Sequence, residues 1–373
     1  MTTMTNEEAL DQVMPAVESA AIEVDRTGTF PRESVRALGE AGLLGLTSAT
    51  EVGGRGEGMS AAAGVIERLA GSCASTAMVT LMHYCATAVI EAHGPESVRR
   101  DIAAGRHLTT LALSEVGSRS QFWAPLSTAV ANGTSVRLDA RKSWATSAGE
   151  ADSYVWSSRP AIAEGASTIW LVPANTPGLE VAGPFDGLGL RGNSSRPITA
   201  TGVTVPLEAM LGPDGGGFDV MMGVVLPWFQ VLSAACSIGI ADATIQRTAR
   251  HVTTARFEHL DQTLADQPVT RAHVARMRVQ ADLARALLAD TLAAIEVGRP
   301  DAMLRVLEVK PAASEAAVAV TDLAMRVCGG AAFRKEVGVE RNFRDARAAT
   351  VMAPTTDALH DFIGRAVCGL PLF

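Results

Sequence analysis

The side chains best suited to nucleophilic, acid–base or metal chemistry near neutral pH are dispersed along this sequence. Seven histidines show no HxxxH or HExxH spacing, and none of the five cysteines belongs to a CxxC pair. Each cysteine lies among apolar or small residues, which predicts buried reduced thiols rather than a redox centre. The sequence therefore gives no support to a structural or catalytic metal site.

Two glycine-rich stretches could let the backbone approach a ligand closely. The segment 51–60, EVGGRGEGMS, has no preceding strand and no closing Lys-Ser or Lys-Thr pair, so an inter-helix loop is favoured over a phosphate cradle. Gly329-Gly330 follows a long apolar-periodic segment, and alone it predicts the end of a helix. Neither stretch by itself indicates a binding site.

The elements that must position these residues follow from the hydrophobic periodicity. Apolar residues recur at three- and four-residue spacing from residue 7 to about 107, which predicts helices. From 109 to about 211 the period changes to two, in short segments separated by Gly, Pro, Asn and Asp, which predicts an antiparallel sheet or barrel. The helical period returns near 220–256, 269–297, 303–328 and 353–368.

The predicted fold is therefore α+β, mostly α, in three domains. An N-terminal α-helical domain at 1–108 precedes a middle antiparallel β-domain at 109–213 and a C-terminal domain of four helices at 214–373. With 373 residues and 47% apolar content, the chain can bury a large core.

Charge and composition restrict the partners. The formal net charge of −8 is spread along the chain without a basic run, so nucleic acid and anionic membranes are not expected to bind. The N-terminus carries Glu7 and Glu8 in place of the basic residues of a signal peptide, and no apolar stretch of membrane-spanning length is evident. We expect a cytoplasmic protein that acts on a small molecule.

Five motifs in chain order resemble those of the acyl-CoA dehydrogenase superfamily. They are LALSEVGSRSQF at 111–122, KSWATSAGEAD at 142–152, Arg256 followed eleven residues later by Gln267, RVCGG at 326–330, and FRDARAATVMAPTT at 343–356. The resemblance covers essentially the whole chain, and it implies a helical N-terminal domain, a β-domain and a C-terminal four-helix bundle.

The resemblance implies a flavoprotein, with FAD as the cofactor and transiently used reduced FMN as the alternative. A flavin needs an apolar wall for its ring, and donors for its ring nitrogens and pyrophosphate. Trp144 and Thr146 would wall the ring and reach N5, whereas Trp144 alone reads as an ordinary sheet-core aromatic. The implied cofactor-binding residues are Leu113, Ser114, Ser120, Trp144, Thr146, Arg256, Gln267, Gly329, Gly330 and Thr355. Some of these reach a neighbouring subunit in the family, so a homodimer or homotetramer is expected.

The sequence departs from the family where a glutamate removes the substrate α-proton. Counted from the matched Arg344-Asp345, that position holds Ala353, and Pro354 replaces the following glycine. Some family members place the base on the helix before the Arg256 match, where His251 is the nearby group that could accept a proton. The sequence also departs from the family's motifs at Arg119 and Gln121 in the 111–122 match and at Arg326 in the 326–330 match.

Three functional interpretations follow, and the first is somewhat favoured. DALHD at 357–361 is similar to a segment of dibenzothiophene-type flavin monooxygenases, which implies an oxygenase or N-oxygenase supplied by a flavin reductase. His360 would then line the flavin, His83 could supply a second histidine, and Thr146 would contact N5. The alternative for His360 is that it caps or pairs on a helix with Asp357 or Asp361.

The second interpretation is an FAD-dependent dehydrogenase of an acyl-CoA or acyl-carrier-protein thioester, with His251 or another displaced base. Retention of Arg256, Gln267, Gly329-Gly330 and Thr355 favours tightly bound FAD and this interpretation. Electron-transfer flavoprotein would be the redox partner. The third is a flavin-binding but catalytically silent subunit, which the lost base would also permit.

Overall fold

The computed structural model describes residues 4–119 and 121–372. The chain divides into two compact units, which are described separately. The first unit comprises 1–65, 75–187 and 191–229, and the second comprises 66–74, 188–190 and 230–373. The predicted N-terminal helices and the predicted β-domain thus fall mostly within one unit.

The N-terminal helices begin and end at local sequence signals. They are α1 (Asn6–Thr27), α2 (Arg32–Glu40), α3 (Met59–Ser72), α4 (Ala74–His93) and α5 (Glu96–Ala103). Thr5 and Glu8 form a capping box at the start of α1, and Gly28 in the left-handed conformation ends it. The segment 51–60 is the predicted loop between two helices, and a Cβ on Gly54 would lie 2.2 Å from the carbonyl oxygen of Ser48.

The β-part of the first unit contains two sheets. One has the order β1-β4-β5, and the other the order β2-β3-β7-β6. The strands are β1 (Thr109–Ala112), β2 (Thr128–Asn132), β3 (Ser135–Ala145), β4 (Ser153–Ser158), β5 (Thr168–Pro173), β6 (Leu179–Val181) and β7 (Arg196–Pro206). All pairs are antiparallel as predicted, except β1 and β4, which run parallel. Short α6 (Gly217–Val220) follows the sheets.

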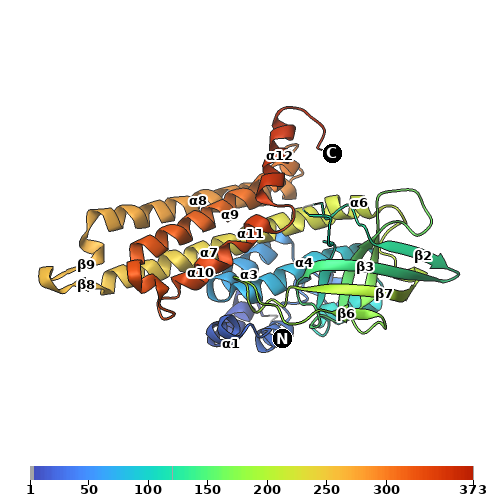
Figure 1. The fold of residues 1–373 in the computed structure, drawn as a ribbon, viewed down its shortest axis with the longest axis horizontal. Coiled ribbons are helices and arrows are strands. Elements are labelled where there is room, and N and C mark those ends of the chain that lie inside the picture. The colour runs from blue at the N-terminus through green and yellow to red at the C-terminus, as the bar shows by residue number, and fades with distance from the viewer. Residues whose placement is uncertain (1–3, 120, 373) are drawn as a thin grey trace. The chain divides into compact units, whose positions relative to one another are not determined.

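The four long helices predicted for the C-terminal part are present. They are α7 (Leu226–Thr254), α8 (Pro268–Glu296), α9 (Ala302–Cys328) and α12 (Thr356–Val367), and α8 packs along α9 (Figure 1). The sequence did not predict α10 (Val339–Ala346), α11 (Ala348–Val351) or the hairpin of β8 (Arg256–Phe257) and β9 (Gln262–Thr263). Gly239 of α7 permits close contact with 66–74, because a Cβ there would lie 2.2 Å from the Glu67 carbonyl oxygen.

Two sequence-based expectations need correction. By length and composition, the helical stretches 217–254 and 302–333 could each cross a membrane, although 83% of the apolar window in the first is buried within the structure. The buried core helix of a globular protein meets the same criteria of length and composition, because its apolar surface packs against protein instead of lipid. Four of the five cysteines are buried, whereas Cys368 is exposed.

Candidate functional site

The loop predicted to contact a flavin is tied to β3 by backbone hydrogen bonds. It begins after β1 with Leu113, which is buried, and Ser114. The Ser143 amide donates to the Ser114 carbonyl oxygen at 2.9 Å, and the Val116 amide donates to the Arg141 carbonyl oxygen at 3.0 Å. The loop and the β3 segment that carries Trp144 and Thr146 are thus adjacent. Ser120 lies outside the described residues.

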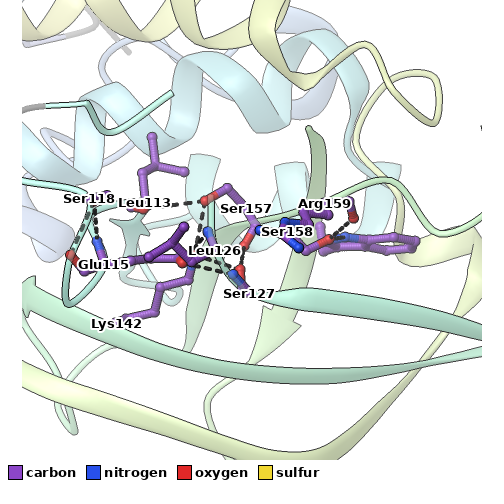
Figure 2. A network of polar contacts seen from close by, with 10 residues as sticks. Leu113, Glu115, Ser118, Leu126, Ser127, Lys142, Ser157, Ser158 and Arg159 are labelled. Carbon is purple, nitrogen blue, oxygen red and sulfur yellow. Dashed lines mark hydrogen bonds and ion pairs between the residues drawn. The ribbon is translucent and has the colours of Figure 1, made fainter. Parts of the chain in front are cut away.

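A buried ion pair between Glu115 of this loop and Lys142 of β3 anchors the loop to the strand (Figure 2). Lys142 is fully buried, and its Nζ lies 2.6 Å from Oε1 of Glu115. The ammonium also donates to the carbonyl oxygen of Ser157 at 2.7 Å and to its Oγ at 2.9 Å. Glu115 Oε2 accepts the amides of Leu126 and Ser127 at 2.6 and 2.8 Å. Glu115 therefore joins the loop to β3 and to the segment before β2, and Lys142 also joins β3 to β4.

The two pKa values of this pair move down for different reasons. Burial lowers the pKa of Lys142 to about 8, against the opposing effect of the nearby carboxylate. Burial would raise the pKa of Glu115, but the charge of Lys142 and the hydrogen bonds from Lys142, Ser127 and Leu126 together outweigh burial, so the pKa is lowered. Both groups are therefore charged at neutral pH.

Sequence reasoning overlooked this pair, although one signal was available. Residues 136, 138, 140 and 142 form the buried face of β3, so Lys142 occupies an inward position in an alternating strand. An inward lysine needs a partner, because a buried unpaired charge is costly. That requirement could have directed attention to Glu115.

Trp144 is not part of the sheet core. It is 69% exposed, and its backbone is left-handed with φ of 56°. The register between β3 and β7 shifts between Lys142 and Ala145, so a bulge turns the indole away from the buried face. A left-handed residue other than glycine costs about 1–2 kcal/mol, and such strain is concentrated at functional sites. The sheet-core interpretation is therefore wrong.

Thr146 follows the bulge and lies beneath the surface, only 1% exposed. The next residue, Ser147, is also left-handed, with φ of 58°. Its buried Oγ has no hydrogen-bond partner among residues 4–119 and 121–372. The segment therefore presents an exposed aromatic face beside a polar group that a ligand could satisfy.

His83 has the environment of a structural histidine. It is fully buried in α4, with Nε2 3.0 Å from the Leu44 carbonyl oxygen. Its Nδ1 accepts the Thr109 amide at 3.2 Å. Burial lowers its pKa to about 4, so the ring is neutral. A catalytic role would require one of these backbone contacts to break, which argues against that prediction.

In the second unit, Arg256 and Gln267 lie at the two ends of the hairpin connection between α7 and α8. The Arg256 guanidinium pairs with the Asp261 carboxylate, and its side chain is 51% exposed. Gln267 Nε2 donates to Gln262 Oε1 at 2.9 Å. Arg256 is exposed and Gln267 half-buried, and their approach to a neighbouring subunit stays a prediction.

Gly329 caps the C-terminal end of α9, as its position after the apolar segment predicts. Both Gly329 and Gly330 are exposed, and a Cβ added to either would meet no described atom within 4 Å. This open space would let a ligand approach the backbone closely.

Two candidate residues, Thr355 and His360, follow α11 and lie five residues apart at the start of α12. Thr355 is the N-cap of α12, and its Oγ1 accepts the Ala358 amide at 3.4 Å. His360 is exposed, with Nε2 3.6 Å from Oε1 of Glu315 on α9. The interpretation of His360 as a pairing residue thus finds a partner on α9, whereas Asp361 pairs with Arg365.

His251 lies in the last turn of α7 and is half-buried. Burial lowers its pKa, and the nearby Arg334 guanidinium lowers it further. The imidazole is therefore neutral at neutral pH, which is the form that can accept a proton. The neutral imidazole is the form that a general base requires, but this protonation state does not show where a substrate binds.

In the first unit, the exposed Trp144 indole beside the 113–119 loop offers a face that fits an aromatic ring such as that of a flavin. In the second unit, described by itself, Gly329-Gly330 offers open backbone. The described residues contain no group of three or more His, Cys, Asp and Glu side chains that could hold a metal ion.

Comparison with known proteins covers nearly the whole chain. The family models for the acyl-CoA dehydrogenase N-terminal, middle and C-terminal domains match residues 2–105, 110–203 and 215–368. The mitochondrial short-chain specific acyl-CoA dehydrogenase of Bos taurus is 30% identical over 90% of this chain and 82% of its own length. The probable acyl-CoA dehydrogenase YngJ of Bacillus subtilis is 26% identical over 97% of this chain and 96% of its own.

Solved structures agree with the fold. Butyryl-CoA dehydrogenase from Megasphaera elsdenii superimposes with a TM-score of 0.89 at 22% identity, covering 99% of each chain. A glutaryl-coenzyme A dehydrogenase in complex with glutaryl-CoA gives 0.91 at 24% identity, covering 98% of this chain and 95% of that one. At these identities the likeness concerns the arrangement of the chain only.

Proposed function

The chain belongs to the acyl-CoA dehydrogenase family of flavin-dependent oxidoreductases, and from this premise we propose that it is an FAD-dependent dehydrogenase of an acyl thioester. The observation that carries the proposal is the exposed, left-handed Trp144 beside the pinned 113–119 loop. Curated relatives that match over most of their lengths are named as acyl-CoA dehydrogenases. Dehydrogenation therefore stands ahead of the oxygen-using reaction that the sequence alone favours.

The reaction breaks one C–H bond at the α-carbon and one at the β-carbon of the acyl group, and forms a C=C bond. Bound FAD would accept the two electrons and the β-hydrogen. The chain must remove the α-proton, and Ala353 cannot do so at the position matched to the family's glutamate. We propose that a displaced base removes the proton, and His251 is the candidate that the sequence offers. Its imidazole is neutral, but it lies near Arg334, beyond the C-terminal end of α9, whereas residue 353 lies beside Lys310, roughly 27 Å away along that helix.

Anaerobic mixing of the purified protein with a panel of acyl-CoA and acyl-carrier-protein thioesters tests the proposal. The yellow band of the oxidised flavin should bleach at a rate that saturates with the correct thioester. His251→Gln tests the candidate base: slower bleaching without loss of bound flavin would assign proton removal to His251, and an unchanged rate would exclude it. A protein that retains FAD and is bleached by no thioester would contradict the proposal.

A gain-of-function substitution sharpens the test. If position 353 faces the substrate α-carbon, Ala353→Glu should restore a carboxylate base and accelerate bleaching by about two to four powers of ten. Ala353→Gln is the matched control, because it has the same size but cannot take the proton. Equal rates in the two variants would show that position 353 does not serve the base.

The second candidate is an oxygenase, and the accessible ring of His360 is the observation that favours it. Its side chain is 52% exposed on α12. In that case the protein would consume oxygen only when a flavin reductase supplies reduced flavin, and thioesters would leave the bound flavin oxidised. Oxygen-electrode traces with and without a reductase separate this candidate from the first.

The assembly, the redox partner and the compartment belong to the same proposal. We propose a homodimer or homotetramer in the cytoplasm, with Arg256 and Gln267 reaching the FAD of a neighbouring subunit and electron-transfer flavoprotein accepting the electrons. Arg256→Ala should reduce FAD retention and leave the monomer folded. Normal FAD retention in this variant would contradict the cross-subunit role.

A further inference from the structure

A second lysine, Lys310 of α9, is buried without having been singled out by any sequence motif. It is fully buried, on the same face of the helix as Val306, Leu307, Ala313 and Ser314. Most buried positions of this helix are apolar or small, so a four-carbon ammonium side chain there is exceptional. Its contacts therefore call for a physical explanation.

The Lys310 ammonium holds the turn that joins α11 to α12. Its Nζ donates to the carbonyl oxygen of Met352 at 2.8 Å and to that of Pro354 at 2.6 Å. Both α11 and α12 pack against α9, the helix that carries the lysine (Figure 1). One side chain thus fixes the backbone on both sides of Ala353 and directly before Thr355.

While Lys310 is charged, these two contacts are stronger than ordinary hydrogen bonds. A charged donor makes shorter bonds, roughly twice as strong as those between neutral groups. They also satisfy carbonyl oxygens at the end of one helix and before the N-cap of the next, which have no partner in a helical ladder. Burying an ammonium costs free energy, and its two hydrogen bonds fix the backbone conformation of residues 352–355.

We propose that Lys310 is a positioning residue, which sets the 352–355 turn so that Thr355 and residue 353 meet the flavin and the substrate. This inference rests on the proposed function for the identity of the substrate. It adds a residue to which neither the motifs nor the comparisons give a role. Lys310 acts through the turn and does not itself touch the substrate.

Burial lowers the pKa of Lys310 to about 7, so the ammonium loses its proton near neutral pH. Deprotonation would leave the amine with two hydrogens and weaken the charge-assisted contacts. The same geometry therefore agrees with a turn that is held most firmly on the acid side of neutrality.

The test compares Lys310→Met with wild type and with Ser314→Ala, a control one helical turn away on the same buried face. Lys310→Met should retain FAD, shift the visible flavin band, and slow thioester-dependent bleaching about tenfold to a hundredfold with little change in KM. Amide hydrogen exchange of residues 352–358 should become faster, also in the protein without substrate. Ser314→Ala should leave all three measurements unchanged.

A double-variant cycle distinguishes positioning from general support of the fold. Thr355→Val should slow bleaching. In the double variant with Lys310→Met, the bleaching rate should fall by less than the product of the two single-variant fold decreases. A double variant whose rate falls by the full product of the single-variant fold decreases would overturn the proposal. An unchanged flavin band and bleaching rate in folded Lys310→Met would do the same. Where Lys310→Met does not fold, Lys310→Gln, whose shorter side chain keeps an uncharged N–H donor group, serves the same test.

The two proposals fail in different ways. If no thioester bleaches the wild-type flavin, the proposed dehydrogenation fails, but the flavin band and the hydrogen exchange still report on Lys310. If thioesters bleach the wild type and Lys310→Met equally, only the positioning role fails.

Discussion

Two buried lysines fix two connecting segments, and they do so by different means. Lys142 anchors the 113–119 loop through an ion pair with Glu115, whereas the contacts of Lys310 that hold the 352–355 turn are to backbone carbonyls. Burial lowers both pKa values, to about 8 and about 7. The loop is thus held by opposite charges, whereas the turn is held by a charge and peptide dipoles. The first arrangement depends on a carboxylate, and the second on the charge of the lysine alone.

The largest effect is expected where the ion pair is broken. Glu115→Gln should lower the free energy of unfolding by about 3–5 kcal/mol, because it leaves the Lys142 ammonium buried without its carboxylate. Urea denaturation at pH 7 measures the change. Adding Lys142→Met to Glu115→Gln should recover part of the loss, since the uncompensated charge is then removed.

The control is Glu23→Gln, which removes an exposed partner of Arg26 on α1. It should leave the urea midpoint unchanged, because solvent screens exposed pairs. A Glu115→Gln protein as stable as wild type would mean that the loop does not depend on the ion pair, and the comparison of the two lysines would lose its basis.

The pH dependence of stability should reveal the second lysine. Between about pH 7 and the ordinary lysine pKa of 10.5, the unfolded chain binds a proton at residue 310 that the folded chain has released. The free energy of unfolding contributed by Lys310 therefore rises with pH in this window. Subtracting the Lys310→Met profile from the wild-type profile isolates it.

Lys142 contributes a slope of the same sign over the narrower window from about pH 8 to 10.5. The wild-type minus Lys310→Met difference should therefore begin to rise at lower pH than the corresponding difference for Lys142→Met. Parallel stability profiles for wild type and Lys310→Met would contradict the low pKa and the charged contact to the turn.

A smaller change in the free energy of unfolding, of opposite sign, is expected at Trp144, beside the 113–119 loop. Trp144→Gly should raise the free energy of unfolding by about 1 kcal/mol or less, because glycine adopts the left-handed backbone without strain. The same variant should bind less FAD, as measured by the ratio of flavin to protein absorbance. Trp144→Phe keeps an aromatic face and serves as the control. A marked loss of stability in Trp144→Gly would show that the indole supports the fold.

Periodicity predicted most of the fold because large apolar faces impose it. The apolar repeats of α8 and α9 and the alternation of β3 each reflect burial of one face, which the residue types record directly. The short elements escaped prediction. Eight-residue α10 is largely polar, and the hairpin strands contain two residues each, so neither carries enough periods to be distinguished from a loop.

The site was less predictable because its decisive contacts join distant parts of the sequence. A bulge set by pairing with β7 turns Trp144 outward, and residue types alone do not specify that shift in register. The partners of Lys310 are carbonyl oxygens 42 and 44 residues further along, which every residue possesses. Each lysine left one readable signal, since a charged residue occupies an inward position of an alternating strand or an apolar helix face, but neither signal names the partner.

The smallest effect is expected at His360, beyond the turn that Lys310 holds. The contact with Glu315 is 3.6 Å long and both side chains are about half exposed, so His360→Ala should change the free energy of unfolding by less than about 0.5 kcal/mol. Glu315→Gln is the matched control for the lost pair. For a dehydrogenase, thioester bleaching should also be unchanged. If His360→Ala instead uncouples oxygen use from product formation while Glu315→Gln does not, the histidine serves oxygen chemistry, and the turn positions a different reaction.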